Sequence, residues 1–135
     1  MLKINNIEYK IIEKFIDFDP YEAIVDGIKR KGKALYITLM TDDFKLCIET
    51  VYDLEWLKEL KASDKKDISK YIIGLPYEDK NGWIYLSDKC NCTINRINNN
   101  NNTFKFDFNG TFSDIDEDYD ETFNIEYCDV IEITN

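Results

Sequence analysis

Two runs near the C-terminus alternate between apolar and polar residues. Phenylalanine occupies every second position of residues 104–108, and isoleucine or an aromatic residue recurs with the same period in residues 123–133. Because successive side chains of a β-strand point to opposite faces, this period places each apolar set on one face. The stretch 103–135 therefore predicts two half-buried strands. Asp129 falls on the apolar parity of the second run, which predicts a β-bulge near Cys128–Val130.

A dense group of carboxylates separates these two runs. Residues 114–121 contain six acids among eight residues. Residues 98–135 hold ten acids and one base, Lys105, for a net charge of −9, whereas residues 1–97 have a net charge of −1. A field of this sign repels nucleic acid and anionic membranes and attracts basic surfaces.

The N-terminal third also favours strands joined by tight turns. Asn5-Asn6 separates a short strand from a longer one, which has either a bulge near Ile11-Ile12 or a helix over residues 8–16. Asp19-Pro20 predicts the end of this segment, because the residue before proline is restricted to extended conformations. Further strands are expected over 21–28, 33–40 and 44–48, with turns at Lys29–Gly32 and 41–43.

Two Asn-Gly pairs carry turn information. Asn81-Gly82 lies between extended runs and predicts a hairpin, because both residue types accept positive φ. Asn109-Gly110 predicts either a second tight hairpin or a bulge within one longer strand. A strand is expected over Cys90–Ile97, followed by a loop of five asparagines at Asn98–Asn102.

Two segments have helical spacing instead. Thr50 and Asp53 match a capping box, and leucine recurs every third residue over 54–60, which predicts a helix over about 51–61. Ser63-Asp64 is a second capping signal, for a helix over about 64–73. We therefore predict an α+β fold: a strand-dominated antiparallel sheet or partly open barrel with two inserted helices, in a single domain spanning residues 1–135.

No apolar stretch has the length of a signal peptide or of a membrane span. This predicts a cytoplasmic location without a membrane partner, where the four cysteines stay reduced.

The sequence contains no histidine, which removes the usual general base at neutral pH and the commonest metal ligand. It also has no P-loop, nucleophile elbow or dinucleotide fingerprint. We therefore predict a protein that is not an enzyme and has no cofactor. Cys90 and Cys92, joined by Cys128 if the three converge, could hold zinc, but their spacing departs from that of structural zinc sites, and buried apolar cysteines are the simpler interpretation.

Two other possible metal sites match the sequence less well. The acids of residues 114–121 do not fit a calcium loop, because Glu121 stands where that loop requires glycine. Asp67, Glu78 and Lys80 loosely match a magnesium-dependent nuclease core, but the net charge of −10 opposes an approach to DNA. The basic segment Lys29–Lys33 is interpreted as a solvated turn. We predict no metal site and no direct nucleic-acid partner.

The acidic segment remains as the candidate functional surface. Closely spaced carboxylates present negative charge much as a phosphate backbone does, and they would speed association with a basic partner. The sequence predicts a stoichiometric inhibitor of the phage anti-defence, anti-CRISPR or toxin-immunity type, which blocks a basic surface of a nuclease, a CRISPR effector or a toxin. Tyr119 and Phe112 would add the buried anchors that charge alone does not supply. The predicted partner-binding residues are Asp114, Asp116, Glu117, Asp118, Tyr119, Asp120 and Glu121.

Two alternatives stay open. The acidic segment could be a solvated loop that only protects strand edges from pairing. The chain could also be a structural or adaptor module of a larger assembly, which binds through its sheet edge or through an apolar helix face around Trp56.

Overall fold

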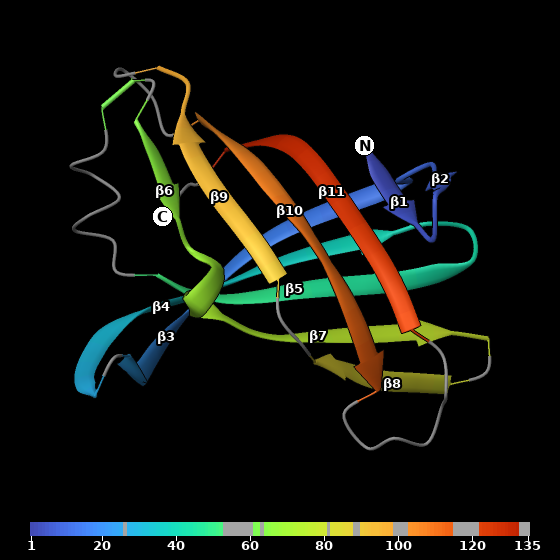
Figure 1. Cartoon of the computed structure of the whole chain (residues 1–135), viewed down its shortest axis with the longest axis horizontal. Helices are drawn as coiled ribbons and strands as arrows, with labels where there is room; N and C mark the ends of the chain where they lie inside the picture. Colours follow the sequence, from blue (N-terminus) through green and yellow to red (C-terminus); the bar gives the residue numbers. More distant parts are fainter. Residues whose placement is uncertain are drawn as a thin grey trace.

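The computed structural model describes residues 1–25, 27–52, 61–62, 64–80, 82–87, 90–98, 103–114 and 122–132, and most of these residues lie in β-strands (Figure 1). The strands are β1 (Leu2–Ile4), β2 (Ile7–Tyr9), β3 (Glu13–Val25), β4 (Ile28–Met40), β5 (Phe44–Tyr52), β6 (Lys65–Asp67), β7 (Ile72–Asp79), β8 (Gly82–Ser87), β9 (Cys90–Arg96), β10 (Thr103–Asp114) and β11 (Thr122–Glu132).

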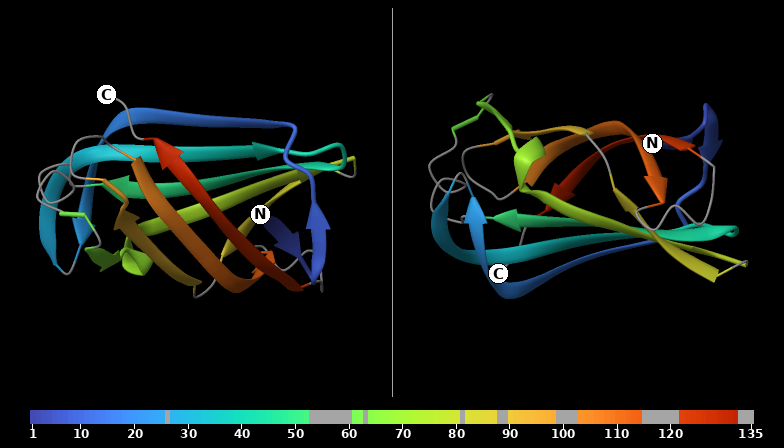
Figure 2. Two further views of the ribbon diagram at one scale, coloured as in Figure 1. Left: turned by 90° about the horizontal axis from the view of Figure 1, so that it is seen from above. Right: turned by 60° about the horizontal axis from the view of Figure 1, so that its bottom comes forward.

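The strands form one antiparallel network that folds over into two layers (Figure 2). Its order is β2-β1-β11-β10-β8-β7-β5-β4-β3, with β9 pairing with β10 and β6 pairing with β9. The layers are joined because β10 changes its partner along its length. Residues Phe104–Gly110 pair with β9, whereas Ser113 and Asp114 pair with β8.

The hydrophobic core lies between the two layers. The layer of β3, β4, β5, β7 and β8 faces the layer of β1, β11, β10, β9 and β6, and each supplies the apolar parity of its strands. The two alternating C-terminal runs are confirmed as half-buried strands, since their apolar residues point inward and their polar residues outward. The fully buried side chains include Leu35, Ile37, Leu39, Leu46, Ile48, Phe104, Phe106, Phe108, Phe112 and Tyr127.

The predicted α+β class with two inserted helices is wrong. The described residues contain no α-helix, only the 3₁₀ turn η1 (Ser69–Tyr71). The segment predicted as a helix over 64–73 forms β6, η1 and the start of β7. The predicted helix over 51–61 begins inside β5, and residues 53–60 lie outside the described residues.

The second helix was mispredicted because one turn imitated helical spacing. Ile68 and Tyr71 are both buried, and a single 3₁₀ turn places residues three apart on one side. The expected capping residue Asp64 bonds backwards, accepting a hydrogen bond from the Lys61 N–H at 3.0 Å. Pairing of β6 with β9 then takes the backbone bonds that a helix would have needed.

The predicted turn at Lys29–Gly32 and the predicted end at Asp19-Pro20 are also wrong. β3 and β4 form one long hairpin that turns between Val25 and Ile28, where Gly27 adopts φ 76°. β3 is the edge of the network, and an edge strand tolerates proline because one row of its N–H groups bonds no neighbour. β4 pairs with β5 only from Lys33 onward, so the hairpin continues beyond the sheet.

The asparagine-rich turns give mixed outcomes. The hairpin at Asn81-Gly82 is confirmed, since Asp79 pairs with Gly82. Asn5 and Asn6 also make the expected turn, between β1 and β2, with φ 52° and 67°. Asn109-Gly110 is neither a hairpin nor a bulge: the pairing with β11 runs through it without a register shift. The alternative helix over 8–16 is wrong, because β2 and β3 occupy most of that range.

No bulge accommodates Asp129, contrary to expectation. The β10–β11 register is continuous from Thr103 to Ser113, so Asp129 keeps the inward parity. Its carboxylate accepts hydrogen bonds from the Tyr127 hydroxyl at 2.9 Å and from the Lys14 Nζ at 2.8 Å. Lys14 belongs to β3, so this acid ties the edge of one layer to the other layer. A polar partner, rather than a backbone irregularity, makes Asp129 tolerable there.

The Asp129→Ala variant tests this tie. It should lower the free energy of unfolding by about 1–3 kcal/mol, because the buried Tyr127 hydroxyl loses its acceptor. In a Tyr127→Phe background the same change should cost about 1 kcal/mol or less, since only the partly exposed pair with Lys14 remains to be lost. Urea unfolding of the four proteins measures this, and an equal cost in both backgrounds would contradict it.

Low pH should weaken the interactions of Asp129 with Lys14 and Tyr127. Partial burial raises the pKa of Asp129, but hydrogen bonds from Lys14, Tyr127 and the Val130 N–H outweigh it and lower the pKa below its usual value. A carboxyl with a lowered folded-state pKa stabilises above its unfolded pKa of about 3.9 and loses that contribution as pH falls through the folded pKa. Below about pH 4, unfolding free energy should therefore fall less steeply for Asp129→Asn than for the native chain. Identical slopes in urea titrations would overturn this.

Candidate functional site

The acidic segment connects β10 to β11 along the chain. Asp114 is the last residue of β10, and the other predicted partner-binding residues, Asp116, Glu117, Asp118, Tyr119, Asp120 and Glu121, lie outside the described residues. The structure describes the two strands that hold the segment. Ser113 pairs with Thr122, and the pair before it, Phe112 and Phe123, is buried. The strands on either side of the acidic segment are therefore anchored to the core.

Phe112 does not serve as the surface anchor that the sequence suggested. Its side chain is fully buried and stacks on Phe108, with ring centroids 5.5 Å apart. The apolar parity of β10 continues through Phe112 because the strand keeps its register past Asn109-Gly110.

An aromatic row supports this end of the molecule. Phe123 contacts Tyr77 at 5.2 Å, Tyr77 contacts Phe44 at 5.3 Å, and Phe44 contacts Tyr9 at 4.9 Å between ring centroids. Five acids and three lysines flank the row in sequence; these residues are Glu8, Asp42, Asp43, Glu78, Asp79, Lys10, Lys45 and Lys80. The residues that flank the row therefore already carry a net negative charge, without any contribution from residues 114–121.

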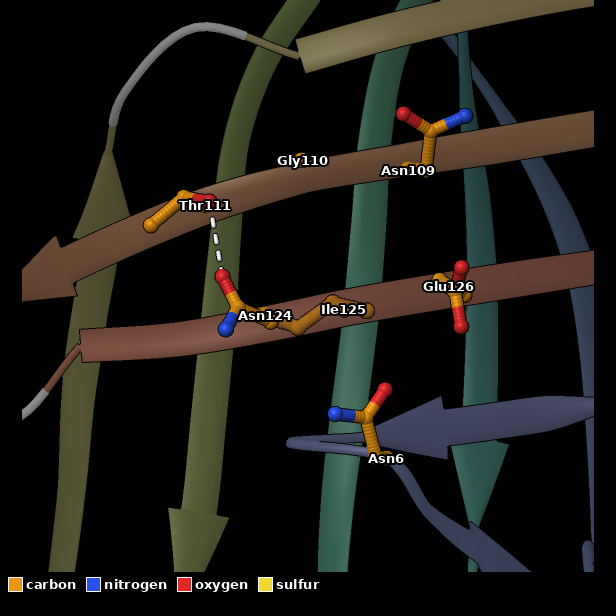
Figure 3. A pocket seen from close by; sticks show the side chains of 7 residues that line it. All are labelled: Asn6, Asn109, Gly110, Thr111, Asn124, Ile125 and Glu126. Atoms are coloured by element: carbon orange, nitrogen blue, oxygen red, sulfur yellow. Dashed lines mark hydrogen bonds between the residues drawn. The ribbon is translucent and has the colours of Figure 1, made fainter.

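A shallow polar depression lies on the outer face of the same hairpin (Figure 3). Its volume is about 250 Å³, and it is lined by Asn6, Asn109, Gly110, Thr111, Asn124, Ile125 and Glu126. The Thr111 hydroxyl donates to the Asn124 Oδ1 at 2.7 Å across the two strands. Asn6 reaches toward β11 from the β1–β2 turn.

The backbone holds this depression in place. The Asn5 N–H donates to the Asn124 carbonyl at 2.8 Å, and the Asn124 N–H donates to the Asn5 Oδ1 at 2.9 Å. Asn109 and Glu126 are register partners across β10 and β11. The side chains of Asn6, Asn109 and Glu126 make no hydrogen bond or ion pair to other described residues, so they are available to a ligand.

Sequence reasoning missed the depression because its asparagines resembled turn signals. The sequence pattern of Asn109-Gly110 predicts only a turn or a bulge, not a surface residue that lines a pocket. The available signal was parity, since Asn109, Thr111, Asn124 and Glu126 all occupy the outward positions of their strands. The contribution of Asn6 to the lining cannot be predicted from strand parity, because Asn6 comes from the other end of the chain and only the fold brings it to β11.

The three cysteines considered for zinc do not converge. Cys90 and Cys92 share the inward parity of β9, and Cys92 is fully buried. Cys128 follows the buried Tyr127 and therefore points to the opposite face of the sheet. Burial raises the pKa of the Cys92 thiol strongly and that of Cys90 to about 11, which leaves both protonated and poor as ligands.

The loose nuclease-like set is also dispersed. Asp67 lies in β6 of one layer, whereas Glu78 lies in β7 of the other. The Asp67 carboxylate accepts hydrogen bonds from both the N–H and the hydroxyl of Ser69, which lower its pKa and use it to shape the η1 turn. Among the described residues no cluster of three or more histidine, cysteine or acidic side chains is placed to hold a metal ion.

The basic segment lies in a strand rather than a turn. Residues 29–32 belong to the part of β4 that extends past β5, whereas Lys33 is the first residue that pairs with β5. Lys29 forms an ion pair with Glu22 of β3 at 3.2 Å. β4 runs from this basic part to Met40, next to the turn that begins at Thr41. The basic part of β4 and the end of β10 lie at different ends of the molecule (Figure 1).

Comparisons with protein-family models, curated proteins and solved structures give no match to this chain. Within the described ranges, no helix has the length and apolar character that crossing a bilayer demands.

Metal analysis and thiol labelling test the arrangement of the cysteines. The purified chain should hold less than about one tenth of an equivalent of zinc, since the thiols stay protonated and Cys128 faces away. At pH 8, Cys92 should react with a thiol reagent only when the chain is unfolded in urea. Stoichiometric zinc, or labelling of Cys92 in the native protein as fast as in urea, would contradict the geometry.

Proposed function

We propose that this chain is a stoichiometric, non-enzymatic inhibitor that docks the acidic end of its β10–β11 hairpin onto a basic surface of another protein. The partner class is a nucleic-acid-binding or catalytic protein such as a nuclease, a CRISPR effector or a toxin. The proposed contact residues are those of the acidic segment, 114–121. A cytoplasmic location fits this role, and the four cysteines are unpaired thiols.

One observation carries the proposal: six of the ten acids in residues 98–135 lie in residues 114–121, between Ser113 and Thr122, which pair across β10 and β11. Charge concentrated in one part of a chain steers association and selects a partner by its potential. A charged tail without anchored ends would lose more conformational entropy on binding. Here the strands that flank the segment are already ordered by pairing and by burial of Phe112 and Phe123.

The adaptor alternative has one specific observation in its favour. The β3–β4 hairpin extends beyond β5 and exposes Ile24 and Ile28, with 76% and 56% of their surface accessible. Exposed aliphatic groups at a projecting hairpin suit a contact made through shape and burial. Trp56, the other residue considered for that role, lies outside the described residues. An Ile24→Ser/Ile28→Ser variant that loses a partner retained by the acidic-segment variant would favour this function.

The Asp116→Asn/Asp118→Asn/Asp120→Asn variant tests the inhibitor proposal. The full chain, immobilised, should capture a basic protein from a lysate of its own organism and release it as salt rises. At low salt the variant should bind about tenfold or more weakly, and its affinity should depend less on salt, because fewer charges are screened. The captured protein should lose its nucleic-acid binding at one equivalent of the native chain.

A matched control separates position from total charge. The Glu13→Gln/Asp17→Asn/Glu22→Gln variant removes three exposed acids from β3 instead. It should bind nearly as the native chain does. If both variants lose affinity equally, net charge alone explains the binding and the position of the acids does not matter. Unchanged affinity in the acidic-segment variant would overturn the proposal.

A further inference from the structure

We propose that the depression on the outer face of β10 and β11 receives a guanidinium group, the side-chain end of an arginine on the basic partner. This inference rests on the proposed function, since it names the group that the same hairpin would recognise. It concerns the described pocket rather than the acidic segment. The two are adjacent, because Thr111 lies three residues before Asp114 on β10.

The size and lining of the depression point to one side chain. Sites for cofactors and drug-sized ligands measure roughly 300–1,000 Å³ and are mostly apolar. This depression measures about 250 Å³, and its lining side chains are mainly amide, hydroxyl and carboxylate groups. It is therefore suited to a small polar group that arrives as part of a larger partner.

The charges around the depression favour a cation. Among the described residues that line it, Glu126 is the one charged group, and none is a lysine or an arginine. Asp107 lies diagonally across from Glu126, because Asp107 pairs with Cys128 and Asn109 pairs with Glu126. Such diagonal neighbours are about 7–8 Å apart. Two unpaired carboxylates so close on one face attract positive charge.

Nearby lysines do not cancel this preference. Lys3 is the register partner of Glu126 on β1, but it is also the register partner of Glu8 on β2. It therefore stands between two acids, and no ion pair joins it to either within the described residues. Lys105 lies two residues from Asp107, about 7 Å, and four residues from Asn109, about 13 Å at 3.3 Å per residue. The three acids Glu8, Asp107 and Glu126 still outnumber Lys3 and Lys105.

The spread of acceptors favours guanidinium over ammonium. The carboxylate of Glu126 and the amide oxygens of Asn109 and Asn6 come from three separate strands or turns around an open, shallow floor. Guanidinium is planar and presents five N–H donors, so it can bind a carboxylate in a bidentate manner and still donate to amides. An ammonium is a compact, strongly hydrated point charge that matches this layout less well.

Solution NMR on the full ¹⁵N-labelled chain tests this, with N-acetyl-arginine methylamide as the probe and N-acetyl-lysine methylamide as the charge-matched control. The arginine probe should give saturable shifts at the side-chain amides of Asn6 and Asn109 and at the Gly110 N–H, with roughly millimolar affinity. It should bind several-fold more tightly than the lysine probe. Glu126→Gln should weaken arginine about tenfold, whereas Glu132→Gln, an exposed acid on the same face of β11, should not.

Three results would overturn the inference: no saturable shift, equal response to both probes, or shifts that survive Glu126→Gln. The test stands apart from the proposed function, because the Asp116→Asn/Asp118→Asn/Asp120→Asn variant should keep the arginine shifts. If that variant loses the basic protein while the native chain ignores arginine, only the pocket assignment fails. If the native chain binds arginine but captures no basic protein, only the inhibitor function fails.

Discussion

The pairing of β10 with β11 is the constraint on which the rest of the structure depends. Its register places Phe104, Phe106, Phe108 and Tyr127 in the core, each fully buried. Burial of each such side chain contributes about 1.5–3 kcal/mol. A shift of the register by one residue would expose all four side chains and would bury outward-facing charged residues such as Lys105 instead. The observed register is therefore strongly favoured over the neighbouring ones.

The same strand pair joins the two layers and presents the candidate surface. β10 leaves β9 after Gly110 and meets β8 at Ser113, so one strand belongs to both layers. Beyond that point the chain enters the acidic segment. On the outward parity of the same residues lie the side chains of the polar depression. One ladder therefore carries core packing on its inner face and the proposed recognition groups on its outer face and beyond its end.

Local pattern predicted the strands but not their partners. Alternation identified β10, β11 and β9, and turn chemistry identified the Asn81-Gly82 hairpin. The helix over 64–73 failed because tertiary burial of Ile68 and Tyr71 in a single 3₁₀ turn overrode the local spacing. The bulge at Asp129 failed because its partner, Lys14, lies 115 residues away in the sequence. The acidic segment was identified from charge alone, whereas the depression beside it requires the β1–β2 turn to meet β11.

Hydrogen–deuterium exchange on mixing with the captured basic protein would test the docking surface most directly. Added protection should concentrate in peptides that cover residues 111–126, which contain the end of β10, the acidic segment and the start of β11. Peptides from the β3–β4 hairpin should exchange as they do in the free chain. Protection confined to residues 19–32, with residues 111–126 unchanged, would contradict the account and place recognition on the projecting hairpin instead.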